Sequence, residues 1–241
     1  METSTTEDAL LDGRVRLRQP RRGYRVAVDA VLLAAATAPA PGARVLDLGT
    51  GVGAVGLCLA ARIPDCHVVG VELQPALAEL AAHNAEANGL AARVRILVHD
   101  IARPLTDTLG RFECVATNPP YLAAAVADPS PDASKALATV ESSADLARWL
   151  AVATGALEPS GTLTMIHRGD RLEEIVILLA KLGWGEVTTK CLPPASRVLV
   201  RARRAPRLQL RESPPLILHG PDGRYTDAAE AVLRCAAAIV F

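Results

Sequence analysis

The sequence predicts an α/β fold in which a mostly parallel, doubly wound sheet carries helices on both faces. Short apolar runs alternate with longer segments of helical periodicity from about residue 44 to residue 204. One of the first runs leads directly into a glycine-rich turn that opens a helix, "DLGTGVGAVG" at 47–56. Half of the 241 residues are apolar, which is enough to build one sizeable core.

A single domain over residues 1–241 is expected, because no internal repeat or interdomain linker interrupts the chain. Residues 1–25 form an arginine-rich N-terminal arm, residues 26–204 form the α/β core, and residues 205–241 form a C-terminal extension.

The core is expected to begin with a helix, because "VAVDAVLLAAATA" has helical apolar spacing and stops at "PAPG", residues 39–42. Strands are predicted at the short apolar runs 44–49, 67–72, 93–100, 111–118, 161–168 and 197–204. Further helices are predicted at 54–63, 75–88, 144–157 and 171–183. Pro75 opens the second of these and Gly89 closes it, as is typical of helix ends.

Two segments outside this alternation have weaker patterns. Residues 123–142 form an Ala/Asp/Pro/Ser-rich loop whose length suits a substrate loop, although a surface loop would have the same composition. In the C-terminal extension, "LILHG" predicts a short strand and a helix is expected to start near Thr226.

Composition argues against several classes of protein. No apolar run approaches the ~18 residues of a membrane span, and the N-terminus "METSTTEDAL" is polar and acidic, unlike a signal peptide. We therefore expect a cytoplasmic location. The five cysteines are widely spaced and contain no C-x-x-C pair, which favours neither a disulfide framework nor a zinc site. No bound metal is expected.

Arginine is clustered in two windows, although the net charge of the whole chain is zero. Neither window contains an acidic residue, so each is a candidate contact for a phosphate-bearing partner such as RNA. The members are Arg14, Arg16, Arg18, Arg21, Arg22 and Arg25 in the first window, and Arg197, Arg201, Arg203, Arg204, Arg207 and Arg211 in the second.

The glycine-rich turn lies where Rossmann-like folds bind a nucleotide-type cofactor. Gly51, Gly53 and Gly56 form a G-x-G-x-x-G pattern with Glu72 about 20 residues later, so a dinucleotide is one alternative. Asp47 argues against it, because a carboxylate at the mouth of the turn would repel a pyrophosphate. The same carboxylate would favour the ammonium and sulfonium groups of S-adenosylmethionine.

The candidate cofactor-binding residues follow three successive predicted strands. Glycines let the backbone approach a ligand closely. We expect Glu72 to accept hydrogen bonds from ribose hydroxyls and Asp100 to accept one from an adenine amino group. Each residue alone fits an ordinary turn or strand end, but together they indicate one crevice. The full set is Asp47, Gly49, Thr50, Gly51, Gly53, Glu72, Leu73, Asp100 and Ile101.

These motifs carry a resemblance to a known family. "VLDLGTGVG", "VELQP", "NAEANGL", "HDI" and "NPPY", in this order and spacing, resemble the class I S-adenosylmethionine-dependent methyltransferases over about residues 26–204. "RLRQPRRGYRVAVDAVLLAAA" and "LHGPDGRYTDAAEAVLR" are similar to the bacterial tRNA1(Val) adenine-N6 methyltransferases. The resemblance implies a Rossmann-like fold, S-adenosylmethionine as the cofactor, and methyl transfer to the exocyclic N6 of an adenine in tRNA.

In such enzymes the [ND]-P-P-[YFW] motif receives a planar nitrogen, which implies that Asn118, Pro119, Pro120 and Tyr121 are the catalytic set. The Asn118 side-chain oxygen and the Pro119 carbonyl would accept the two N–H groups of the acceptor, so that its lone pair turns toward the methyl group. The prolines hold the carbonyl direction fixed before reaction. Tyr121 would offer a face on which the acceptor stacks.

Other functions remain as alternatives. A glutamine side-chain amide on a translation release factor, or the N2 amino group of a guanine in ribosomal RNA, could use the same motif. A nicotinamide dehydrogenase is disfavoured by Asp47. A binding module without catalysis is disfavoured by the complete set of cofactor and acceptor residues.

Overall fold

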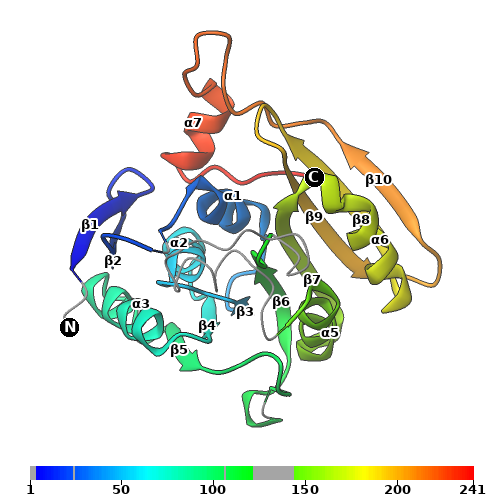
Figure 1. Ribbon diagram of the computed structural model, residues 1–241, viewed down its shortest axis with the longest axis horizontal. Coiled ribbons are helices and arrows are strands. Elements are labelled where there is room, and N and C mark those ends of the chain that lie inside the picture. Colours follow the sequence, from blue (N-terminus) through cyan, green and yellow to red (C-terminus); the bar gives the residue numbers. More distant parts are fainter. Residues whose placement is uncertain (1–3, 24, 106, 122–143) are drawn as a thin grey trace.

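The computed structural model describes residues 4–23, 25–105, 107–121 and 144–241, and within them the centre is an eight-stranded sheet (Figure 1). The strand order is β10-β8-β9-β7-β6-β3-β4-β5. β9 is antiparallel to both of its neighbours, whereas the other pairings are parallel, which confirms the predicted mostly parallel sheet. The strands are β3 (Arg44–Leu48), β4 (His67–Glu72), β5 (Val94–Val98), β6 (Phe112–Thr117), β7 (Leu157–Arg168), β8 (Trp184–Leu192), β9 (Arg197–Arg204) and β10 (Gln209–Ser213).

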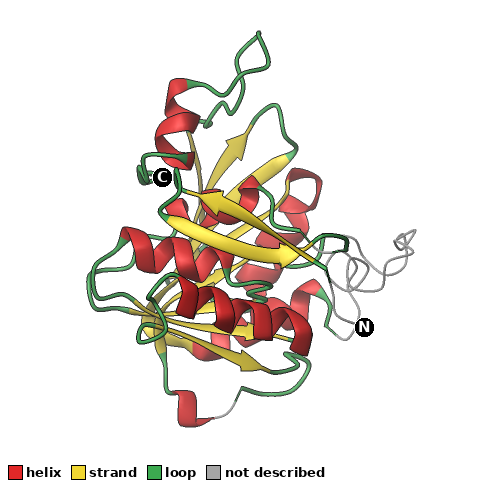
Figure 2. Ribbon diagram, turned by 90° about the vertical axis from the view of Figure 1, so that its left-hand side faces the viewer, coloured by secondary structure: helices red, strands yellow, loops and turns green. Residues whose placement is uncertain are grey.

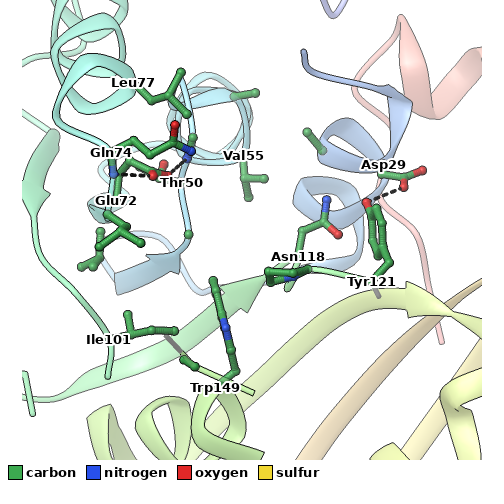
Figure 3. A pocket seen from close by; sticks show the side chains of 18 of the residues that line it. Asp29, Thr50, Val55, Glu72, Gln74, Leu77, Ile101, Asn118, Tyr121 and Trp149 are labelled. Carbon is green, nitrogen blue, oxygen red and sulfur yellow. Dashed lines mark hydrogen bonds between the residues drawn. The ribbon is translucent and has the colours of Figure 1, made fainter. Parts of the chain in front are cut away.

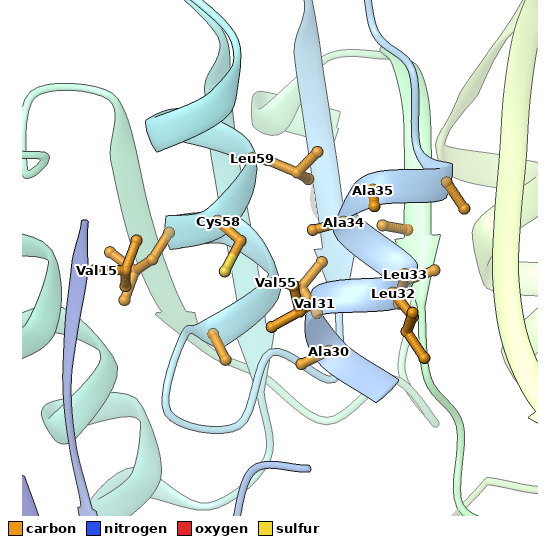
Figure 4. Packing of buried hydrophobic residues seen from close by; sticks show 14 of the residues in the cluster. Val15, Ala30, Val31, Leu32, Leu33, Ala34, Ala35, Val55, Cys58 and Leu59 are labelled. Atoms are coloured by element: carbon orange, nitrogen blue, oxygen red, sulfur yellow. The ribbon is translucent and has the colours of Figure 1, made fainter. Parts of the chain in front are cut away.

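Helices cover both faces of the sheet and bury one hydrophobic cluster on each. On the first face, α1 and α2 pack closely through small residues such as Ala34, with Val31 and Val55 between them (Figure 4). α5 and α6 bury the second cluster. The helices are α1 (Val28–Ala36), α2 (Ala54–Arg62), α3 (Pro75–Ala87), α5 (Leu146–Ala156), α6 (Leu172–Lys181) and α7 (Asp227–Leu233), with short 3-10 turns η1 (Asp107–Leu109) and η2 (Gly169–Arg171).

Side chains of the central strand β3 alternate between the two faces. Val45 belongs to the cluster under α1 and α2, whereas Leu46 and Leu48 belong to the cluster under α5 and α6. Successive strand residues point to opposite faces, so Asp47 points to the same face as Val45, toward α2.

The N-terminal arm is a β-hairpin rather than an irregular segment. β1 (Thr5–Leu10) and β2 (Val15–Pro20) pair antiparallel, with Leu10 opposite Val15. Val15 and Leu17 are buried while Arg16 and Arg18 are exposed, which is the alternation of a half-buried strand. The hairpin forms an outer layer beyond α2 and α3 (Figures 1 and 2).

Two asparagines of α3 attach this hairpin to the core. Asn84 is buried; its Nδ2 donates to the carbonyls of Arg18 (2.9 Å) and Val52 (3.0 Å), and its Oδ1 accepts from the Arg18 amide at 2.8 Å. Asn88, one turn later, makes the same two-way contact with the backbone of Arg16, at 2.8 and 2.7 Å. The side chains thereby satisfy the open edge of β2 as a neighbouring strand would.

The C-terminal extension adds β10 to the sheet edge and packs α7 against α1. The helix expected near Thr226 is confirmed, because Thr226 caps α7 through its Oγ1, which accepts from the Ala229 amide at 3.2 Å. The strand predicted for "LILHG" is wrong: this segment makes only one isolated bridge, between His219 and Tyr225. β10 pairs with β8 up to Lys190. Beyond this point, the Leu216 and Leu218 amides of the segment that follows β10 donate hydrogen bonds to the carbonyls of Cys191 and Pro193.

The expectations for the loop and for membrane spans can be compared only with the described residues. The predicted loop 123–142 lies outside the described residues. In the described ranges, every helix is too short or too polar to cross a membrane.

Candidate functional site

A pocket of about 420 Å³ opens where β3, β4 and β6 end, and residues from both termini of the core line it (Figure 3). β3 lies between β4, the next strand in sequence, and β6, so the strand order reverses here. Open α/β sheets bind ligands at such a reversal, outside the carboxyl ends of the strands. The predicted residues that line the pocket are Gly49, Thr50, Gly51, Glu72, Leu73, Asp100, Ile101, Asn118, Pro120 and Tyr121.

The glycine turn is held tightly against the end of β4. The amides of Gly49 and Thr50 both donate to the Val71 carbonyl at 2.9 Å. Gly49 has φ +81°, and a Cβ placed on it would lie 2.5 Å from the Trp149 ring. Only glycine fits this position, and the turn backbone therefore forms one wall of the pocket directly.

Glu72 ends β4 as a buried carboxylate, 8% exposed. Its Oε2 accepts from the Gly51 amide at 2.9 Å and its Oε1 accepts from the Gln74 amide at 2.8 Å. Burial raises the pKa of this carboxyl, and the two backbone donors act against that shift. Each oxygen has further lone-pair capacity, so Glu72 can accept hydrogen bonds from a ligand with neighbouring hydroxyls.

The expectation that Asp47 faces the ligand needs correction. Asp47 is 1% exposed and is not among the pocket-lining residues. Its Oδ2 accepts from Thr50 Oγ1 at 2.5 Å and from the Gly56 amide at 3.2 Å. Burial raises the pKa of Asp47 to about 6. Asp47 thus holds the turn from the side that faces away from the pocket. Its carboxylate does not face a bound ligand directly, so the argument that it would repel a pyrophosphate at close range does not hold.

Gly53 and Pro119 also lie outside the pocket lining. Gly53 is the N-cap of α2 with φ +89°, and its missing side chain leaves room for Ala81 of α3. Pro119 is buried beside Pro120. Both residues shape the backbone that carries their pocket-lining neighbours.

Part of the pocket lining is apolar, and Leu73, Ile101 and Trp149 contribute to it. Asp100 lines the same pocket, and its Oδ1 accepts from the Ala102 amide at 2.9 Å. The sequence analysis missed Trp149. It lies in the predicted helix 144–157, but one helix has several faces and the sequence does not show which one meets the glycine turn.

Asn118 projects between the residues around Glu72 and the Tyr121 ring (Figure 3). The preceding residue anchors it, because Thr117 Oγ1 donates to the Leu48 carbonyl at 2.8 Å. The Asn118 Oδ1 atom is buried and makes no hydrogen bond to any described residue. A buried acceptor without a partner costs about 1–3 kcal/mol, so this atom is suited to an N–H donor that arrives with a ligand.

Asp29 and Arg197 hold the Tyr121 side chain in place. The sequence analysis did not identify Asp29, and it gave Arg197 only as a candidate RNA contact. The Tyr121 hydroxyl donates to Asp29 Oδ2 at 3.1 Å, and the Arg197 Nε donates to the same oxygen at 2.9 Å. The Arg197 guanidinium lies 4.5 Å from the centre of the Tyr121 ring. Burial, with the charge of Asp29, raises the pKa of Tyr121 to about 12, so the hydroxyl stays protonated.

His167 of β7 supports the same segment from the sheet. It is fully buried, its Nε2 lies 3.4 Å from the Pro120 carbonyl, and its Nδ1 has no partner among the described residues. Burial lowers the pKa of His167 to about 4, so the ring is neutral at pH 7. A neutral imidazole with Nε2–H donates to the Pro120 carbonyl.

The two arginine windows differ in structure. The first is exposed along β2 and the segment leading to the pocket, where Arg25 pairs with Asp8 and lines the rim. The second runs from β9 through the following connection into β10. Arg197 lines the pocket, whereas Arg204 packs over Trp184 at the other end of β9. Only Arg25 and Arg197 of the twelve lie together at the site.

Comparison with known proteins agrees with this geometry. A family model described as methyltransferase small domain matches residues 26–187, and the chain belongs to this family. Among solved structures, a predicted O-methyltransferase from Agrobacterium tumefaciens superposes with a TM-score of 0.71 at 26% identity, over 88% of this chain and 98% of that one. A 16S rRNA N2 methyltransferase from T. thermophilus in complex with AdoMet and guanosine gives a TM-score of 0.60 at 24% identity, over 84% and 50%.

The chain is therefore a class I S-adenosylmethionine-dependent methyltransferase. Curated relatives named tRNA1(Val) (adenine(37)-N6)-methyltransferase include one from Porphyromonas gingivalis, 33% identical over 69% of this chain and 68% of the relative. Another, from Aeromonas hydrophila, is 30% identical over 86% and 87%. A release factor glutamine methyltransferase from Deinococcus radiodurans is 37% identical over 67% of this chain and 58% of the relative.

In the described parts of the chain, no group of three or more His, Cys, Asp or Glu side chains is arranged to hold a metal ion.

Proposed function

We propose that this enzyme methylates the exocyclic N6 amino group of an adenine in tRNA. The observation that carries the proposal is the buried Asn118 Oδ1, which lacks a hydrogen-bond partner within the described structure and lies in the same pocket as Glu72 and the glycine turn. The names of relatives that cover most of the chain support tRNA adenine as the acceptor.

In this proposal the cofactor occupies the half of the pocket around Glu72. Glu72 accepts both ribose hydroxyls, and the backbone of Gly49, Thr50 and Gly51 approaches the remainder of the molecule. Asp47 and Gly53 act indirectly by shaping the turn. The adenine ring is assigned to the apolar side chains of Leu73, Ile101 and Trp149, with its amino group directed to Asp100.

The acceptor occupies the other half, between Asn118 and Tyr121. When bound, S-adenosylmethionine supplies an electrophilic methyl group on its sulfonium sulfur. Asn118 Oδ1 accepts one N–H of the acceptor amine. We assign the second N–H to the Pro119 carbonyl, although Pro119 lies beside the pocket-lining Pro120 and not in the lining itself. With both protons held, the nitrogen lone pair is directed at the methyl group. The methylated amine is acidic enough to lose its proton to water, so no residue is assigned as a general base.

The tRNA is proposed to contact the exposed face of the hairpin. Arg14, Arg16, Arg21 and Arg22 are exposed, and their side chains have no hydrogen-bond or ion-pair partner among the described residues. Arg16, Arg21 and Arg22 lie on β2 and on the connection that leads to the pocket rim at Gly23 and Arg25, and Arg14 lies in the hairpin turn that precedes β2. Phosphate groups bound along this path would bring an unstacked adenine to the pocket. A tRNA substrate places the enzyme in the cytoplasm.

A glutamine amide on a release factor is the second candidate, because the Deinococcus radiodurans relative is named for that activity. A primary amide also offers two N–H groups and a delocalised lone pair, so it meets the same Asn118 requirement. Guanine N2 in ribosomal RNA is the third, and it presents the same kind of planar amine.

Mass spectrometry of tRNA, ribosomal RNA and release factors from cells with and without the gene separates the three. The proposal requires that one N6-methyladenosine in tRNA disappears with the gene and returns when the gene is restored. Loss of a methylglutamine, or of N2-methylguanosine in ribosomal RNA, would instead assign the second or third acceptor.

A further inference from the structure

We propose that Asp29 and Arg197 are positioning residues that orient the Tyr121 ring as a stacking platform for a planar acceptor. The inference rests on the proposed function, and it adds two residues to the acceptor half of the site. They come from distant parts of the chain: Asp29 from the first turn of α1, and Arg197 from the first residue of β9. Both line the pocket together with Tyr121, and Figure 3 shows the hydrogen bond between Asp29 and the Tyr121 hydroxyl.

The contacts fix the direction of the ring. The Tyr121 hydroxyl and the Arg197 Nε donate to one and the same oxygen, Asp29 Oδ2, at 3.1 and 2.9 Å. The Asp29 and Arg197 side chains are only 13% and 26% exposed, so water screens this ion pair less than one on the open surface. The shared oxygen ties the tip of the tyrosine to the guanidinium.

A second set of contacts fixes the rotation of the ring. A tyrosine hydroxyl lies on the axis about which the ring turns, so its hydrogen bond alone leaves that rotation free. The Arg197 guanidinium lies 4.5 Å from the ring centre. His167 meets Tyr121 edge to face, with centroids 5.8 Å apart and an interplanar angle of 75°. Guanidinium and imidazole together hold the ring plane.

The arrangement has a consequence for the acceptor. Arg197 lies over one face of the ring, and the inference assigns the opposite face to the acceptor. Stacking on a preoriented ring loses less conformational freedom than stacking on a mobile one. A purine offers a flat partner for such a face, whereas a glutamine amide offers only a small one, so the platform favours a nucleobase.

Two variants separate positioning from simple structural support. Arg197→Lys keeps the charge beside Asp29 but loses the planar group over the ring. Arg44→Lys is the matched control, because the Arg44 guanidinium lies 4.9 Å from the Phe112 ring centre, while Arg44 belongs neither to the arginine windows nor to the pocket lining. With tRNA as substrate, Arg197→Lys is expected to raise KM about 10-fold, within the range of one lost stacking contact, and to change kcat and the Kd for S-adenosylmethionine less than threefold. Arg44→Lys leaves all three unchanged.

A double variant supplies the test of coupling. Tyr121→Leu alone removes the platform, so adding Arg197→Lys to it should raise KM no further. A KM for Arg197→Lys equal to that of the wild type, or effects that multiply in the double variant, would overturn the inference.

The contact itself is measured without substrate from thermal unfolding of the same three variants. We expect the double variant to lower Tm by less than the sum of the two single shifts, and simple additivity would overturn the inference. If the Tm shifts are coupled but the enzyme does not methylate tRNA, the proposed function is refuted and the Tyr121 platform stands. If the wild type methylates tRNA and Arg197→Lys has the same KM, the platform is refuted and the proposed function stands.

Discussion

Glu72 is the residue on which cofactor affinity should depend most directly. Both of its oxygens face backbone amides of the pocket wall, and the carboxylate is nearly enclosed. Replacing it by alanine removes a charged acceptor, and we expect S-adenosylmethionine binding to weaken by about 1–3 kcal/mol. Isothermal titration calorimetry measures this loss. Glu79→Ala, at an exposed position on α3, serves as the control and should bind normally; equal affinities for both variants would remove Glu72 from the cofactor site.

Asn118 should separate catalysis from cofactor binding. Its Oδ1 has no hydrogen-bond partner among the described residues and is proposed to act on the acceptor amine. Asn118→Ala should therefore lower single-turnover methyl transfer by roughly 10²–10³-fold, as loss of a preorganised polar contact does elsewhere. The Kd for S-adenosylmethionine should stay within about twofold of the wild-type value. Asn118→Asp keeps an oxygen acceptor and should retain more activity than the alanine variant. Wild-type turnover in Asn118→Ala would reduce the motif to a rigid strand end.

His167 should make stability depend on pH. Burial lowers its pKa in the folded state to about 4, whereas an exposed histidine in the unfolded chain titrates near ~6.5. Between these values the unfolded state binds more protons, so the free energy of unfolding falls as pH falls through this window. Relative to His167→Gln, the wild type should lose about 3 kcal/mol between pH 7 and pH 4.

Denaturant unfolding of both proteins at each pH measures that difference. Asp47 titrates in the same range with the opposite sign, because its raised pKa of about 6 makes the folded state bind the proton first. The comparison removes this contribution, since Asp47 is present in both proteins. A constant difference across the range would show that His167 is not held in a neutral form.

Residue roles were predicted from sequence where a motif fixes the backbone, and missed where tertiary packing decides. The glycine turn, Glu72 and the Asn-Pro-Pro-Tyr segment follow strand ends and reach one pocket as expected. The inward direction of Asp47 follows from strand alternation, which the sequence analysis did not apply to it. Asp29 and Trp149 reach the site through the packing of α1 and α5, which no local pattern encodes.

At the scale of elements, Asn84 is expected to hold the hairpin on the core. Asn84→Ala leaves the Arg18 amide and the Arg18 and Val52 carbonyls without their partner, and loss of buried hydrogen bonds of this kind costs about 1–3 kcal/mol. Urea unfolding should show this loss, and limited proteolysis should cut the arm first. Asn88→Ala is the comparison: Asn88 is less buried, so water replaces its contacts and the loss should be smaller. Equal stability of wild type and Asn84→Ala would contradict this role.

Elements with strong periodicity were predicted well, and elements that depend on a partner were not. The central strands and helices agree with their predicted ranges to within a few residues. The hairpin was not predicted, although "VRLRQ" alternates apolar and polar residues as a half-buried strand does. The segment was interpreted only as a cluster of positive charge. β8 follows Gly183 without a clear apolar run of its own, and its pairing with β9 and β10 makes it a strand.

At the scale of the whole molecule, the hairpin arginines should dominate RNA binding. Replacing Arg18, Arg21 and Arg22 by alanine removes three exposed positive charges from β2 and from the connection that leads to Gly23 at the pocket rim. Each lost phosphate contact should flatten the log–log salt dependence of tRNA affinity by about 0.7–0.9, so the slope should fall by about two to three units. Titration of labelled tRNA at several salt concentrations measures the slope.

The matched control removes the same charge elsewhere. Arg203, Arg207 and Arg211 are exposed on β9, β10 and their connection, outside the pocket lining. Their replacement by alanine should change the slope less than the hairpin variant does. S-adenosylmethionine affinity should be unchanged in both. An unaltered slope in the hairpin variant would show that its arginines are merely solvated and would favour a protein substrate.

The most direct test of the proposed activity is methylation of unmodified tRNA by the purified enzyme with S-adenosylmethionine. Nuclease digestion and mass spectrometry of the nucleosides identify the methylated atom, and Asn118→Ala provides the matched inactive enzyme. The result expected is N6-methyladenosine at one tRNA position with the wild type, and none above background with Asn118→Ala. Methyl incorporation at guanine N2, or no incorporation into tRNA while a release factor gains methylglutamine, would contradict the assignment of adenine as the acceptor.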